Sequence, residues 1–161
     1  MKNLNTYLLI VIAILMAFLL MLGASDFSIK GLTATSASAQ STQKNIVVHL
    51  THYTDDLHAA SMALMIAGNL QKKGAQVTLH LDLEGVRLVD ARQPDLKWGE
   101  FPAISELYNA FVEAGGQVLA CPACSKAAGV TPESLRPGAK IGKPGEDIPE
   151  MLLAADIVLD Y

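Results

Sequence analysis

Short apolar segments rich in β-branched residues alternate with longer amphipathic segments from Asn45 to the end of this 161-residue chain. The short segments are typical of buried strands, and the longer ones have the spacing of helices that turn one face to a core. Strands that alternate with helices pair in parallel through right-handed crossovers. The sequence therefore predicts a three-layer α/β/α sandwich with a mostly parallel sheet of four or five strands.

The order of these elements can be read along the chain. We expect strands at residues 45–51, 75–82, 117–120 and 156–160. We expect helices at residues 57–74, 101–114 and 148–155, a helix start after Cys121, a short helix at 131–135, and a polar loop at 84–99 with an apolar start at 85–89. The expected caps of these helices are Asp55, Asp56, Thr131 and Asp147. In an open parallel sheet, ligands collect outside the carboxyl ends of the strands. That edge should carry residues 51–58, 82–87 and 121–125.

An uncharged apolar segment, Tyr7–Ala24, precedes this domain. About 18 apolar residues is the lower limit for crossing a bilayer as a helix. Lys2 lies before this segment, and Ala37-Ser38-Ala39 has the small-x-small form that a signal peptidase accepts. We therefore expect residues 1–39 to be a cleaved signal peptide or a hydrophobic membrane anchor with a polar leader. Residues 40–161 would then form an exported domain, periplasmic or membrane-anchored and facing the periplasm or exterior.

Charge and motifs exclude several functions. The formal net charge is −4, whereas a nucleic-acid surface needs clustered Lys and Arg. The sequence contains no G-x-G-x-x-G, G-x-S-x-G or HExxH motif. We expect no nucleic-acid partner, no cofactor and no metal.

Cys121 and Cys124 are the only cysteines, and their C-x-x-C spacing falls at a predicted strand-to-helix junction. Amides at a helix start favour a thiolate, and Pro122 suits the first helical position. Four interpretations remain open. The pair could be a structural disulfide, a thiol–disulfide redox centre, a metal site completed by His52 and His58, or a site where one thiolate carries sulfane sulfur as a persulfide.

Residues 60–88 and 121–129 resemble the DsrE/DsrF/TusD family of sulfur-relay proteins, and the resemblance covers Ile46 to Tyr161. It implies that Cys121, eight positions before Gly129, is the sulfur-accepting cysteine, and that Cys124 matches a second cysteine of some members. It also implies sulfur donor and acceptor proteins as partners, and a homo- or hetero-oligomer. An arginine that members often carry before the glycine is Ala128 here.

Four further residues are candidates for a supporting role. Lys126 could replace the positive charge of the missing arginine. His52 and His58 would lie near the cysteines and could stabilise a thiolate or move a proton, although both could equally be exposed histidines. Asp55 is a candidate hydrogen-bond acceptor. His49 and His80 fall within strands, where we expect packed or solvent-facing side chains.

The resulting hypothesis is an exported or membrane-tethered sulfur-relay protein that accepts and transfers sulfane sulfur on Cys121, with Cys124 as a helper. The alternative is a thiol–disulfide redox or metal-binding assembly module that uses the same pair.

Overall fold

A computed structural model describes Ile14 and residues 43–161. Apart from Ile14, the expected signal peptide or hydrophobic helix of residues 1–39 lies outside the described residues. Within the part that is described, no helix has both the length and the apolar character that a membrane span requires.

Within the described residues, five parallel strands form one sheet in the order β4-β3-β2-β1-β5. The strands are β1 (Asn45–Leu50), β2 (Gln76–Leu81), β3 (Gln117–Ala120), β4 (Ala139–Ile141) and β5 (Ile157–Asp160). The predicted α/β fold is confirmed, and every pairing in the sheet is parallel. The sequence did not predict β4, because a strand of three residues is too short to show a period of two.

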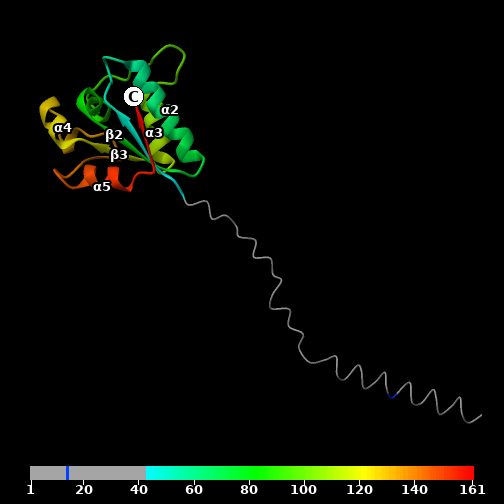
Figure 1. The fold of residues 1–161 in the computed structure, drawn as a ribbon. Coiled ribbons are helices and arrows are strands. Elements are labelled where there is room, and N and C mark those ends of the chain that lie inside the picture. The colour runs from blue at the N-terminus through cyan, green and yellow to red at the C-terminus, as the bar shows by residue number, and fades with distance from the viewer. Residues whose placement is uncertain (1–13, 15–42) are drawn as a thin grey trace, which may run out of the picture. The chain divides into compact units, whose positions relative to one another are not determined.

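Alternate residues of the strands point to the two faces of the sheet. One face carries the buried apolar side chains of the core, including Val48, Leu50, Leu79, Leu81 and Val118. Helices α2 (Leu57–Lys72) and α3 (Ile104–Glu113) cover this face, and α5 (Asp147–Ala154) lies on the opposite side (Figure 1). The helix α4 (Pro122–Ala128) follows β3 and packs against the 3-10 helix η1 (Leu83–Val89).

Helix starts differ in detail from the expectations. Asp56 caps α2 by accepting a hydrogen bond from the Ala59 amide at 2.9 Å, as expected. Asp55 does not cap the helix, because its carboxylate accepts from the Tyr53 amide within the preceding turn. The N-cap of α5 is Glu146, one residue before Asp147. The short helix η2 (Pro132–Ser134) begins after Thr131, as expected.

The segment expected to be a polar loop contains η1, whose Val86, Leu88 and Val89 are buried. Its backbone runs close to β1: the Gly85 amide donates to the Thr51 carbonyl at 3.0 Å. A Cβ atom at Gly85 would collide with the Leu50 carbonyl oxygen. The absence of a side chain at residue 85 is therefore what allows η1 to pack over the end of β1.

We predict that Gly85→Ala destabilises the domain by about 2 kcal/mol or more, because a backbone carbonyl cannot move aside for the added methyl group. Gly68→Ala is the control: it lies in α2 with no atom within 4 Å of the new Cβ. That change should stabilise the domain by about 0.5–1 kcal/mol. Chemical denaturation of the two variants measures both effects, and equal stabilities would contradict the close approach of η1 to β1.

Candidate functional site

The ends of three neighbouring strands meet at one edge of the sheet. Cys121 directly follows β3 and Asp82 directly follows β2. The Cys121 amide donates to the Leu81 carbonyl at 2.9 Å, which continues the β2–β3 ladder into the site. Pro122 then begins α4, as the sequence predicts, and places Cys124 in the first turn of this helix.

The sulfur atoms of Cys121 and Cys124 and a carboxylate oxygen of Asp82 lie within 4.8 Å of one another. Both cysteines are free and half-buried. The Cys124 thiol donates a hydrogen bond to Oδ1 of Asp82, with a distance of 2.7 Å between Sγ and Oδ1. Burial, followed by this hydrogen bond, raises the pKa of Cys124 to about 12. The start of α4 therefore does not lower the pKa of Cys124, and the expectation of a reactive thiolate at Cys121 stays a prediction.

Asp82 is held in place by the backbone as well as by the thiol. Its Oδ1 also accepts from the Leu83 amide at 2.8 Å and so caps η1. Burial raises the pKa of Asp82, but hydrogen bonds from the Cys124 thiol, the Leu83 amide and the Cys121 thiol lower it by more, so that the net pKa is below the ordinary value. Leu83 has a φ of +46°, which is uncommon for a residue with a side chain. This turn places the Asp82 carboxylate within hydrogen-bond distance of the Cys124 thiol.

Two histidines lie behind Asp82 on the sheet. Nε2 of His49 is buried without a hydrogen bond, 3.9 Å from Oδ2 of Asp82, and its Nδ1 donates to Oδ1 of Asp160 at 2.7 Å. The His80 ring stacks on that of His49 with 5.0 Å between centroids. His80 is 4 % exposed, and burial together with His49 lowers its pKa to about 4. The potential metal-ligating atoms of His49, His80 and Asp82 also lie within 4.8 Å of one another, as do those of Asp82 and the two cysteines.

The histidines predicted for the site lie elsewhere. Nδ1 of His52 donates to Oδ2 of Asp55 at 2.7 Å, and this hydrogen bond raises the pKa of His52. His58 stacks on Trp98, with 3.8 Å between ring centroids. Among the described residues, no group of three metal-binding side chains joins either histidine to the cysteines. Asp55 accepts the hydrogen bond of His52 and, within residues 43–161, makes no hydrogen bond to either cysteine. The metal site expected from Cys121, Cys124, His52 and His58 is not formed in the part of the chain that the structure describes.

The residues that do meet left only a weak signal in the sequence. Asp82 lies in the predicted edge segment, and His49 and His80 each lie two residues before the end of a predicted strand. In the parallel register His49 pairs with His80. Aligning the strand of His49 in parallel with the strand of His80 would have placed the two histidines side by side.

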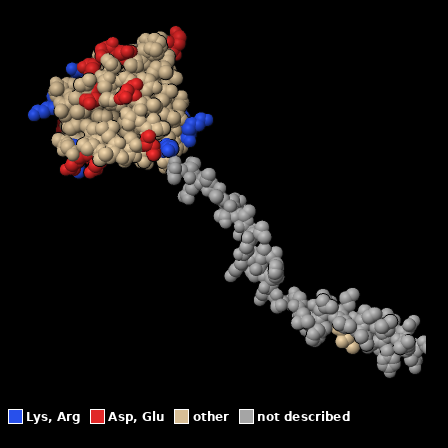
Figure 2. Space-filling view, in the orientation of Figure 1, with Lys and Arg blue, Asp and Glu red and all other residues tan. Residues whose placement is uncertain are grey.

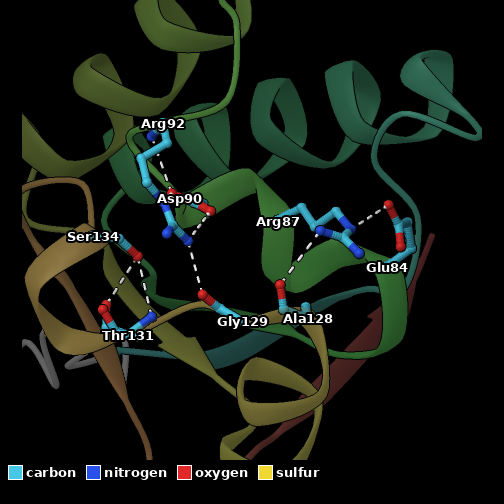
Figure 3. Close-up of polar contacts among 8 residues, drawn as sticks. All are labelled: Glu84, Arg87, Asp90, Arg92, Ala128, Gly129, Thr131 and Ser134. Atoms are coloured by element: carbon cyan, nitrogen blue, oxygen red, sulfur yellow. Dashed lines mark hydrogen bonds and ion pairs between the residues drawn. The ribbon is translucent and has the colours of Figure 1, made fainter.

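Two arginines bind backbone carbonyls at the C-terminal end of α4 (Figure 3). Nη2 of Arg92 donates to the Gly129 carbonyl at 2.8 Å, and Nη1 of Arg87 to the Ala128 carbonyl at 3.5 Å. Arg92 also pairs with the buried carboxylate of Asp90 at 2.7 Å and holds its pKa low. Gly129 ends the helix at a φ of +70°, which suits a residue without a side chain. These contacts fix the helix that carries Cys124.

A cavity of about 260 Å³ opens beside Cys124. Its lining is formed by Leu83, Glu84, Arg87, Cys124, Ala127 and Ala128. Glu84 and Arg87 form an ion pair at 2.8 Å across this surface. Lys126 is exposed on the same helix and lines a separate cavity with Pro122 and Gly129.

The face of the domain in Figure 2 carries separate clusters of carboxylates, with Lys and Arg side chains mostly at its margins. This distribution agrees with the net charge of −4 and gives no basic surface on this face for a nucleic acid.

The fold and the site together define a small parallel α/β protein with a thiol pair at the carboxyl edge of its sheet. The chain belongs to the DsrE/DsrF-like family, whose sequence model matches residues 44–160. This membership confirms the resemblance noted in the sequence.

Solved structures share the fold. The YchN protein from E. coli is 23% identical with a TM-score of 0.60, and the alignment covers 74% of this chain and 99% of that one. MTH1491 from Methanobacterium thermoautotrophicum is 14% identical with a TM-score of 0.59, covering 74% and 100%. BT1422 from Bacteroides thetaiotaomicron is 17% identical with a TM-score of 0.55, covering 73% and 95%. No curated protein sequence matches the chain significantly.

The buried His80 should make the domain sensitive to acid. Between pH 6.5 and about 4, the unfolded chain binds a proton at His80 that the folded domain does not, so stability falls as the pH falls through this range. The loss should reach about 3 kcal/mol. His80→Phe keeps the ring and removes the proton site, and should flatten this part of the stability–pH profile. His58→Phe, at an exposed position, is the control; if both variants follow the wild-type profile, His80 is not the acid-sensitive group.

Proposed function

We propose that this domain is a sulfur carrier, in which Cys121 accepts sulfane sulfur as a persulfide and passes it to another thiol. The observation that carries the proposal is the position of a free, half-buried Cys121 at the carboxyl end of β3 in a DsrE/DsrF-like chain. The Cys124 thiol donates a hydrogen bond to Asp82 and keeps its proton, so the proposal assigns the role of nucleophile to Cys121.

Sulfur transfer needs no change in the total number of electrons. The Cys121 thiolate attacks the outer sulfur of a donor persulfide, a new S–S bond forms, and the donor's own S–S bond breaks. The donor cysteine leaves with the electron pair as a thiolate. An acceptor thiolate then attacks the outer sulfur on Cys121 in the same way and releases the Cys121 thiolate.

The pKa of Cys124 gives less support to a thiol–disulfide redox function. Such a centre needs the second cysteine as a thiolate that attacks a mixed disulfide. Burial and Asp82 raise the pKa of Cys124 to about 12, which opposes that role.

The proposal includes partners outside the domain, namely a sulfur donor and a sulfur acceptor, and an oligomer. Exposed apolar side chains on α5 and β5 favour association, with Leu153 89 % exposed and Leu152, Ile157 and Val158 beside it in the sequence. We further propose that residues 1–39 export or anchor the domain, so that these partners lie in the periplasm or at the cell exterior.

We predict that the full chain, treated with a low-molecular-weight alkyl persulfide, gains one sulfur atom on the Cys121 peptide. Reductant should remove this sulfur. Cys121→Ser should abolish the uptake, and Cys124→Ser should retain it, since only the nucleophile is required. Intact-mass and peptide mass spectrometry measure each result. Loss of two hydrogens without sulfur uptake would contradict sulfur carriage and indicate a disulfide.

A further inference from the structure

A persulfide on Cys121 has a second thiol as its immediate neighbour. The two sulfur atoms lie within 4.8 Å of each other. A Cys124 thiolate at this distance could attack the inner sulfur of the persulfide. The Cys121–Cys124 disulfide would form, the bond to the outer sulfur would break, and this sulfur would leave with the electron pair as hydrosulfide. The two cysteine sulfurs are oxidised and the outer sulfur is reduced, so no other reagent is needed.

This reaction would destroy the cargo of a carrier, and it requires a thiolate, because a thiol is a poor nucleophile. We propose that Asp82 is a positioning residue that preserves a persulfide on Cys121 by holding Cys124 as a thiol. The inference rests on the proposed sulfur-carrier function and assigns a role to a residue outside the cysteine pair.

The contacts of Asp82 suit this role. Oδ1 accepts from the Cys124 thiol at 2.7 Å and from the Leu83 amide at 2.8 Å, so the backbone fixes the oxygen that accepts the hydrogen bond from the thiol. The carboxylate is negative and close to the sulfur, and a thiolate at Cys124 would place two negative charges side by side. Both effects retain the proton on Cys124, in agreement with its raised pKa.

The orientation of the hydrogen bond also restrains the sulfur. While the thiol points to Oδ1, its proton lies between sulfur and carboxylate, and attack on Cys121 requires this bond to break. Asp82 therefore opposes discharge by charge and by geometry, without contact with the transferred sulfur being required.

The variant Asp82→Asn tests the proposal. Asn is a good N-cap residue, so it can keep the cap of η1 while it removes the charge. Asp56→Asn is the matched control, because it removes the charge of another N-cap carboxylate, which accepts from the Ala59 amide of α2 and has no hydrogen bond to a thiol among the described residues. The full chains are loaded with an alkyl persulfide, excess reagent is removed, and the sulfur on Cys121 and the released sulfide are followed with time.

We expect Asp82→Asn to lose its sulfur about tenfold faster than the wild type, with formation of the Cys121–Cys124 disulfide, since a fall of one pKa unit multiplies the thiolate by ten. Asp56→Asn should behave as the wild type. The double variant Asp82→Asn with Cys124→Ser should retain the sulfur again. Equal retention by Asp82→Asn and wild type, or equal loss from the double variant, would overturn the inference. Failure of the wild type to load Cys121 would instead refute the sulfur-carrier function on which it rests.

A second measurement separates this role from a merely structural one. In a Cys121→Ser background, the rate of alkylation of Cys124 by iodoacetamide is recorded against pH, with and without Asp82→Asn. The inference requires the profile to move to lower pH when Asp82 is neutral. An unchanged profile would overturn it.

Discussion

The parallel, in-register pairing of β1, β2 and β3 is the constraint on which the rest of the site depends. It brings Asp82 and Cys121 to one edge, and it sets His49 beside His80 on the face away from α2 and α3. The chain distances between these residues are large, so no local interaction could assemble them. The site is thus a product of strand order, and the core apolar residues that fix this register also fix the distance between the thiols and the carboxylate.

A single carboxylate links chemically different neighbours. Asp82 accepts from a thiol and from an amide, and an imidazole nitrogen lies behind it. Burial alone would favour the protonated acid, and the hydrogen bonds from the Cys124 thiol, the Leu83 amide and the Cys121 thiol reverse this preference. Since a thiol and a carboxylate compete for one proton, the anionic state of Asp82 and the neutral state of Cys124 support each other. The chemistry of the cysteine pair is therefore set by a residue on another strand.

The sequence was sufficient to predict the parallel α/β fold, the edge that carries the site and the position of the cysteine pair, because these follow from periodicity and strand order. It did not predict that Asp82 contacts Cys124, which depends on the turn at Leu83. It also directed attention to His52 and His58. The first is held by Asp55 and the second by Trp98, and such side-chain pairings depend on rotamers and loop paths that no spacing encodes. The buried η1 was missed because seven residues of 3-10 helix give no regular apolar pattern.

Leu83 connects the backbone to this chemistry. It is 64 % exposed and holds a left-handed conformation, and its amide shares one oxygen of Asp82 with the Cys124 thiol. When two donors share one acceptor atom, a change at one donor alters the electron density available to the other. The Leu83 amide is consequently a built-in spectroscopic reporter, whose proton chemical shift follows the protonation and oxidation state of a sulfur atom on a separate helix.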